Sequence, residues 1–226
     1  MIKKIASLLL LTFIVNVVFG QQANTLIKSV SEKFSQVKNF KSNVNIDFDI
    51  PSINMEKMNG KVFYKAPNKF KVKLSGVAFL PKQNPFELYN LLRDTTAYVA
   101  VSNGAEDVNG IKTQVVSVLP IKEQDVVLLK CWINPVSKCI EKSQITTKSS
   151  GTITSTYFYT ANFNYPLPYK INFSIDLTKF KIPKMIAVDI NSKKKSNSNA
   201  SGKTTGSITF IMSQYEINKG VKDDNF

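Results

Sequence analysis

Period-two alternation of apolar and polar residues is the feature that most limits how this sequence can fold. Residues 43–50 read NVNIDFDI, residues 69–74 read KFKVKL, and residues 170–176 read KINFSID. Because successive side chains of a β-strand point to opposite faces of a sheet, each segment predicts a strand with one buried and one solvent-exposed face. The inward sets are Val44, Ile46 and Phe48, then Phe70, Val72 and Leu74, then Ile171, Phe173 and Ile175.

Further strands are expected along most of the remaining chain. We place them at residues 96–101, 112–119, 126–133, 139–147, 152–159, 185–191 and 207–217. The stretches between them are short and turn-like: Asn103-Gly104, Asn109-Gly110, Asn134-Pro135 and residues 149–151. Tight turns join antiparallel neighbours, since parallel strands need long crossovers. The sequence therefore predicts a mostly β (α+β) fold built on an antiparallel sheet that must curve or be covered on its apolar face.

Two helical segments interrupt the β pattern. In residues 24–40 the apolar residues recur at three- and four-residue spacing, which is typical of an amphipathic helix. They are Leu26, Ile27, Val30, Phe34 and Val37. Farther on, Asn84-Pro85 is expected to cap a short, largely apolar helix that includes Leu88 and Leu92. So little helix against so many strands leaves a concave interior, which either Phe and Ile side chains fill or a hydrocarbon chain occupies.

The first 20 residues have the pattern of a secretory signal peptide. Lys3 and Lys4 precede the apolar run 5–18, which is short for a membrane span. Val18 and Gly20 provide compact residues before a cut, so we expect cleavage after Gly20 and export to the periplasm. An uncleaved N-terminal anchor is the alternative.

The remaining residues, 21–226, suit a single domain with its own core. Within it, residues 192–206 consist almost entirely of Lys, Ser, Asn, Gly and Thr, which predicts a mobile polar loop. A basic arm that grips an anionic partner is the alternative interpretation of this segment. We expect the domain to be a monomer.

Basic residues outnumber acidic ones: the chain has 30 Lys and Arg against 16 Asp and Glu, a net charge of +14. This balance favours anionic surfaces such as phospholipid headgroups or acidic glycans. Nucleic acid is not an expected partner, because its recognition relies on arginine, and Arg93 is the only arginine here. A solvated lysine-rich face without any partner is the alternative.

The two cysteines, Cys131 and Cys139, flank one predicted hairpin. A disulfide forms only if the two cysteines are cross-strand neighbours. A register one residue off would point them to opposite faces, so the sequence alone does not decide whether the bond forms. No metal site is expected, because the chain has no histidine and no further cysteine.

The chemistry of common active sites is also missing from the sequence. Zero histidines exclude the Ser-His-Asp and Cys-His arrangements, and no glycine-rich phosphate loop occurs. We therefore expect no catalytic residues and no cofactor. A glycan-active enzyme that uses two converging carboxylates is the enzymatic alternative.

Three short motifs resemble the LolA-like family of outer-membrane lipoprotein carriers and lipoprotein-sorting proteins. Residues 60–70, GKVFYKAPNKF, are similar to the family's glycine, strand and Y-K-x-P-x-K-F stretch. Residues 132–135, WINP, are similar to its W-I-D-P hairpin, and residues 108–120 resemble the strand pair ahead of that hairpin. Together with the order of signal peptide, amphipathic helix and consecutive strands, the resemblance covers most of residues 22–217.

The resemblance implies an incomplete β-barrel, closed by helices, that carries the acyl chains of a lipoprotein, or another lipid, toward the outer membrane. It also implies inner- and outer-membrane transfer partners. The inward sets given above would then line an apolar cavity, with Leu88 and Leu92 on a lid. Core packing is the alternative role for each. The family's arginine on the strand after the first helix, which hydrogen-bonds lid carbonyls, has no counterpart in residues 42–50.

Binding without carriage is the competing function. A non-carrier envelope module would bind anionic lipid or glycan through its lysine-rich face and would have a filled core. Its binding would depend on salt, because exposed charges are screened.

Overall fold

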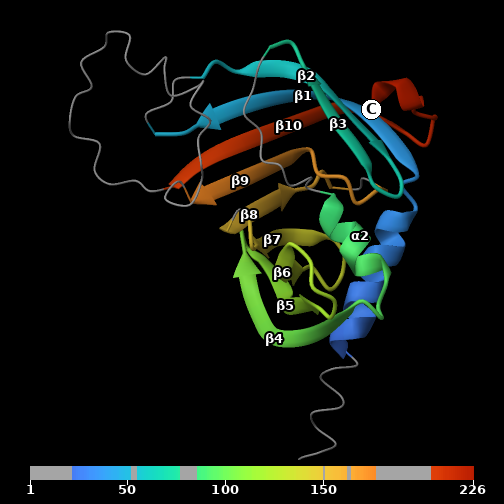
Figure 1. Cartoon of the computed structure of the whole chain (residues 1–226), viewed down its shortest axis with the longest axis vertical. Coiled ribbons are helices and arrows are strands. Elements are labelled where there is room, and N and C mark those ends of the chain that lie inside the picture. The colour runs from blue at the N-terminus through green and yellow to red at the C-terminus, as the bar shows by residue number, and fades with distance from the viewer. Residues whose placement is uncertain (1–21, 52–54, 77–85, 150, 162–163, 177–204) are drawn as a thin grey trace, which may run out of the picture.

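One antiparallel sheet dominates the computed structural model, which describes residues 22–51, 55–76, 86–149, 151–161, 164–176 and 205–226. The sheet has ten strands in the order β3-β2-β1-β10-β9-β8-β7-β6-β5-β4 (Figure 1). The strands are β1 (Asn39–Asp49), β2 (Met58–Lys65), β3 (Lys69–Leu74), β4 (Tyr98–Val108), β5 (Ile111–Pro120), β6 (Val126–Ile133), β7 (Ile140–Thr147), β8 (Gly151–Phe158), β9 (Lys170–Asp176) and β10 (Thr205–Ile217). The helical elements are residues 22–35, α2 (Glu87–Arg93) and the 3-10 turn η2 (Asp223–Asn225).

The topology is a meander whose last strand returns to the first. Strands β4 to β10 follow one another across the sheet, and β10 then pairs with β1, leaving β3 and β4 as the two edges. Figure 1 shows the sheet curving around α2, with the N-terminal helix beside α2 at the open side. The fold class predicted from the sequence, a curved antiparallel sheet forming an incomplete barrel with helices at its concave face, is confirmed.

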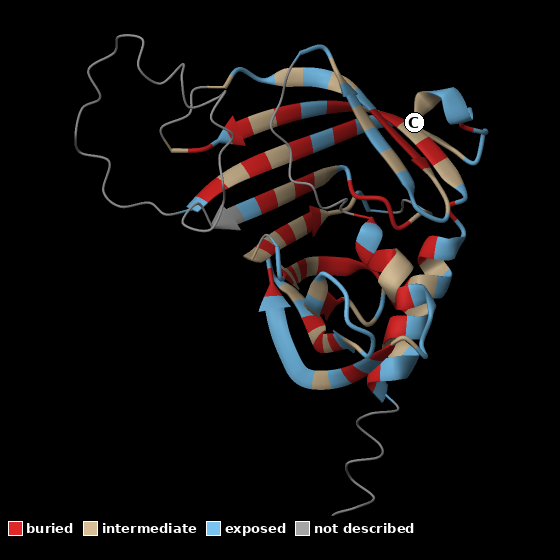
Figure 2. Ribbon diagram, viewed as in Figure 1, coloured by how far each residue is buried: buried red, intermediate tan, exposed pale blue. Residues whose placement is uncertain are grey.

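Alternation produces the strands as expected. In β1 the residues Val44, Ile46 and Phe48 are buried, while Asn45 and Asp49 are exposed. The buried side chains join a core cluster with the N-terminal helix, whose Ile27, Val30 and Phe34 pack onto the sheet. Figure 2 shows this alternation as red and pale bands along the strands.

One predicted turn is wrong. Asn103-Gly104 lies inside β4, which continues through an irregularity between Ser102 and Ala105. Gly104 has φ of 84°, a conformation that glycine adopts without steric cost. A glycine at such a bulge bends a long strand without ending it, which local turn propensity does not reveal.

The other described turns agree with the sequence. Asn109 and Gly110, with φ of 51° and 81°, join β4 to β5, and Asn134-Pro135 opens the turn between β6 and β7. Of residues 149–151, Ser149 precedes and Gly151 begins β8, whereas residue 150 lies outside the described residues.

The predicted helix boundaries need correction. The N-terminal helix ends at residue 35 rather than 40, because Asn39 already pairs with Lys65 as the start of β1. Asn218 holds this change of direction, since its side chain accepts hydrogen bonds from the Lys38 and Asn39 amides. The short helix begins at Glu87, with Phe86 at its N-cap.

Several predictions fall outside the described residues. These are the signal peptide and cleavage site, the cap at Asn84 and Pro85, the strand at 185–191, and most of the loop at 192–206. Residues 205 and 206 of that predicted loop belong instead to β10.

The two cysteines are free and buried. The hairpin register places Cys131 opposite Ser143, not opposite Cys139. Cys139 lies four residues before Ser143, and four residues of extended chain span on the order of 13 Å. This distance exceeds the Cα–Cα separation of about 7 Å that a disulfide can bridge. The disulfide that the spacing left open is therefore not formed.

Candidate functional site

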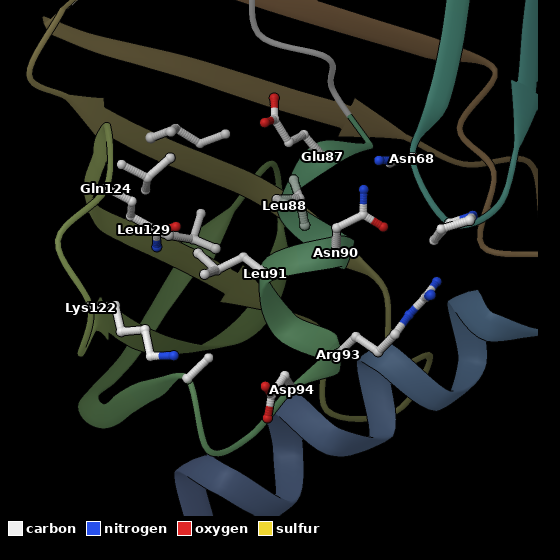
Figure 3. A pocket seen from close by; sticks show the side chains of 14 residues that line it. Asn68, Glu87, Leu88, Asn90, Leu91, Arg93, Asp94, Lys122, Gln124 and Leu129 are labelled. Atoms are coloured by element: carbon white, nitrogen blue, oxygen red, sulfur yellow. The ribbon is translucent and has the colours of Figure 1, made fainter.

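A cavity of about 530 Å³ lies between α2 and the sheet. Its volume is within the range of small-molecule sites, about 300–1,000 Å³. Leu88 and Leu91 line it from α2, and Val126, Leu129 and Ile145 line it from β6 and β7. In Figure 3, Leu91 extends from α2 toward Leu129 across the cavity. The facing walls are thus aliphatic.

Polar groups surround this aliphatic region. Pro67 and Asn68 come from the β2–β3 turn, Lys122 and Gln124 from the β5–β6 connection, and the rest from α2 and the chain that follows it. The α2 group comprises Glu87, Asn90, Arg93, Asp94 and Ala97. Arg93, Asp94 and Lys122 are exposed, so the charges lie toward solvent while the leucines lie deeper.

Asn90, a half-buried residue of α2, has the one buried side-chain polar atom without a hydrogen-bond partner among the described residues. Its Oδ1 is shielded from solvent and has no hydrogen-bond partner there. Buried acceptors are nearly always paired, so this atom is an exception. In Figure 3 the Asn90 amide points away from Leu91 and Leu129, so it is not directed at the aliphatic walls of the cavity.

Aromatic packing holds α2 in place from the other side. The Tyr89 ring stacks on Phe34 with centroids 3.8 Å apart and planes inclined by 3°. The centroid of the Phe86 ring lies 5.8 Å from that of Phe34 and 5.3 Å from that of Phe40. The helix therefore presents Leu88 and Leu91 to the cavity and its aromatic residues to the core.

A hydrogen bond also fixes the end of α2. The Tyr98 hydroxyl donates to the Leu92 carbonyl at 3.3 Å. Burial, together with the negative charge of Asp94, raises the pKa of Tyr98 to about 12, so the phenol stays protonated and remains a donor. This bond joins the end of α2 to β4.

The sequence-predicted residues lie mostly elsewhere in the same interior. Val44, Ile46, Phe48, Ile171 and Phe173 are buried in the core cluster, and Phe70, Val72 and Leu74 pack against it half-buried. Ile175 pairs with Ile153 and Gly206 in the sheet. Leu92 is 0 % exposed in the core. Among the described residues that line the cavity, Leu88 alone belongs to the predicted set. Whether the other ten contact a ligand stays a prediction.

The residues on the sheet side of the cavity were not predicted from the sequence as site residues. Val126, Leu129 and Ile145 lie on strands that were predicted, but their alternation looks like that of any inward residue. Asn90 gave no signal at all. What distinguishes these residues is the empty space opposite them, which depends on the distance between α2 and the sheet.

No helix among the described residues is long and apolar enough to cross a bilayer. No group of Cys, Asp and Glu side chains in that part of the chain is placed to hold a metal ion.

Comparisons by sequence found no protein-family model that matches the chain and no curated protein similar to it. Solved structures do match. A LolA superfamily protein from Nitrosomonas europaea has 14% identity and a TM-score of 0.56, with 89% of this chain and 96% of that chain covered.

Two further structures match over similar lengths. A DUF1329 family protein from Desulfovibrio piger has 10% identity and a TM-score of 0.58, covering 91% of this chain and 95% of its own. An outer membrane lipoprotein-sorting protein domain from Vibrio parahaemolyticus has 8% identity and a TM-score of 0.55, covering 91% and 96%. At these identities the likeness concerns the fold alone, and the chain has the LolA-like fold that its motifs predicted.

Proposed function

We propose that this protein is an exported, non-enzymatic carrier that binds acyl chains of lipoproteins, or another acylated lipid, in the cavity between α2 and the sheet. Delivery toward the outer membrane is part of the proposal. The observation that carries it is the aliphatic cavity of about 530 Å³ with leucines on both walls. Each methylene transferred from water into such a site contributes about 0.8 kcal/mol, so binding strengthens with chain length.

The charged residues at the rim of the cavity support an acylated ligand with a polar headgroup. The exposed Arg93 and Lys122 leave room for a polar headgroup at the solvent side. The shared fold of a protein named for lipoprotein sorting agrees with this ligand class.

Two experiments test the proposal. Native mass spectrometry of the protein purified from its own periplasm, followed by lipid extraction, is expected to find a stoichiometric acylated species. Affinity for a fluorescent fatty acid is expected to rise with chain length and to fall at least tenfold in Val126→Trp, whose indole would project into the cavity and obstruct it. Val127→Trp is the matched control, because Val127 is the next residue, is 39% exposed and does not line the cavity.

Clean apo protein that also ignores the probe would refute carriage. An equal loss in both tryptophan variants would place the probe elsewhere. Binding that depends on salt but not on chain length would support the second candidate, a module that binds anionic lipid or glycan through its lysine-rich face.

A further inference from the structure

The outer face of the β2–β3 hairpin carries an unusual density of lysine. On β3, Lys69, Lys71 and Lys73 are exposed and alternate with inward residues. The sheet register places Lys65 opposite Lys69 and Lys61 opposite Lys73. We call these five lysines the hairpin patch.

Such a patch works against the stability of the hairpin. Like charges directly opposite each other on one sheet face repel, since their Cβ atoms lie about 5 Å apart. Lysines on an edge strand can serve to block edge-to-edge pairing, which accounts for β3. That role does not account for Lys61 and Lys65, because β2 is an interior strand paired on both sides.

In the described chain, one carboxylate offsets part of the positive charge at the turn end of the patch and none at the other end. The Asp223 carboxylate accepts from Lys65 at 2.8 Å and lies 3.0 Å from Lys69. Both hydrogen bonds hold the pKa of Asp223 below its usual value. Among the described residues Lys61 and Lys71 form no ion pair, and Lys73 donates to the Asp224 carbonyl at 3.4 Å and lies 5.3 Å from the centroid of the Phe63 ring.

The patch adjoins the cavity. The turn that joins Lys65 to Lys69 is the one that contributes Pro67 and Asn68 to the cavity lining. The Lys65–Lys69 end of the patch therefore lies beside the cavity, and the Lys61–Lys73 end lies farther along the hairpin.

We propose that the hairpin patch docks the protein on the surface of an anionic phospholipid bilayer. The inference rests on the proposed carrier function and adds which face of the protein meets the membrane that supplies the lipid. Lysine point charges near a bilayer gain from its negative surface potential. A protein partner fits less well, because protein interfaces are depleted in lysine and enriched in aromatic residues, and Phe63, the aromatic residue between the lysines, is 6% exposed.

Vesicle sedimentation tests the patch. The mature protein is expected to bind phosphatidylglycerol-containing vesicles at low salt and to ignore pure phosphatidylcholine. The triple variant Lys61→Gln, Lys71→Gln, Lys73→Gln is expected to lose affinity on the order of 100-fold, from roughly fivefold per lysine. The control, Lys28→Gln, Lys112→Gln, Lys148→Gln, makes the same change in net charge at exposed lysines elsewhere and is expected to change binding little. Two of these lysines have ion-pair partners, Lys28 with Glu32 and Lys148 with Glu123.

Asp223→Asn provides a gain that misfolding cannot imitate. The substitution releases Lys65 and Lys69 from their ion pairs, so vesicle binding is expected to tighten several-fold. Fatty-acid binding in solution is expected to be unchanged in all of these variants, which separates docking from carriage.

Equal losses in the two triple variants would overturn the patch, since net charge alone would then explain binding. Wild-type protein that ignores anionic vesicles would also overturn it and leave an acidic protein as the partner. If vesicles bind through the patch but no acyl probe binds at all, docking stands and the carrier function fails.

Discussion

The two sides of α2 differ in how they are packed. Toward β1 and β2, the rings of Phe34, Phe40, Tyr64, Phe86 and Tyr89 interlock with centroids 3.8 to 5.9 Å apart. Toward β6 and β7, leucines of the same helix face a cavity of about 530 Å³.

The contrast separates stability from binding within one core. Aromatic residues bury large areas and stack in preferred geometries, so the packed side stabilises the fold. The hollow side forgoes dispersion contacts that a ligand would restore. Substitutions on the packed side should therefore cost stability, and those on the hollow side should change ligand binding.

The largest effect is expected at Phe34. Phe34→Ala removes the ring that stacks on Tyr89 and should lower the free energy of unfolding by about 3–5 kcal/mol. Leu91→Ala, on the half-buried hollow side, should cost only about 1 kcal/mol. Urea denaturation measures both, and equal losses would remove the distinction between the two sides.

The second largest loss of stability is expected at Gly60. A Cβ there would clash with the Lys73 carbonyl oxygen, so Gly60→Ala forces β2 and β3 apart and should cost about 1–3 kcal/mol. Gly76→Ala is the control, because its nearest atom would be the Met58 Cε at 3.9 Å. Thermal denaturation should show a lowered midpoint for the first variant alone. Similar thermal midpoints in the two variants would contradict this prediction and show that β2 and β3 accommodate the added Cβ at little cost.

Tyr98→Phe should have a smaller effect on stability, about 1 kcal/mol, through loss of the bond to the Leu92 carbonyl. Because that bond fixes the end of α2, a fluorescent fatty acid should also dissociate faster, as stopped flow can measure. Unchanged dissociation would show that α2 does not gate the cavity.

Alkaline pH gives a second test of the same residue. The pKa of Tyr98 is about 12 in the folded protein, against about 10 when unfolded. Between these values the unfolded chain has already released the proton, so stability falls as pH rises. Tyr98→Phe should remove part of that slope, and an unchanged slope would contradict the assignment.

The smallest effect is expected at Asp223, which is exposed. Its lowered pKa means that its ion pairs contribute above about pH 4 and are lost as pH falls through the folded value. Acid should therefore loosen the C-terminal segment from β2 and β3, measured as faster proteolysis after residue 217. Asp223→Asn should show that behaviour already at neutral pH.

The strands could be predicted from the two-residue alternation of apolar and polar residues and from the turn residues, because both signals are local in the sequence. Val44, Ile46 and Phe48 alternate with polar residues, and the strand follows from that alone. The turn predicted at Asn103-Gly104 was wrong because the same dipeptide occurs in hairpin turns and in β-bulges. The pairing with the neighbouring strand decides which of the two forms.

The cavity could not be predicted in the same way. Leu129 and Ile145 have the pattern of ordinary core residues, and so do Ile46 and Ile171. Which of them face empty space depends on where the aromatic cluster anchors α2. That position is set by contacts between Phe34, on the N-terminal helix, and Tyr89, far away in sequence.

Methyl NMR of the protein titrated with a long-chain fatty acid tests the central claim most directly. The account predicts chemical-shift changes at Leu88, Leu91, Val126, Leu129 and Ile145, with Val44, Ile46 and Ile171 unaffected. Changes centred on Val44, Ile46 and Ile171, or no changes at all, would contradict it.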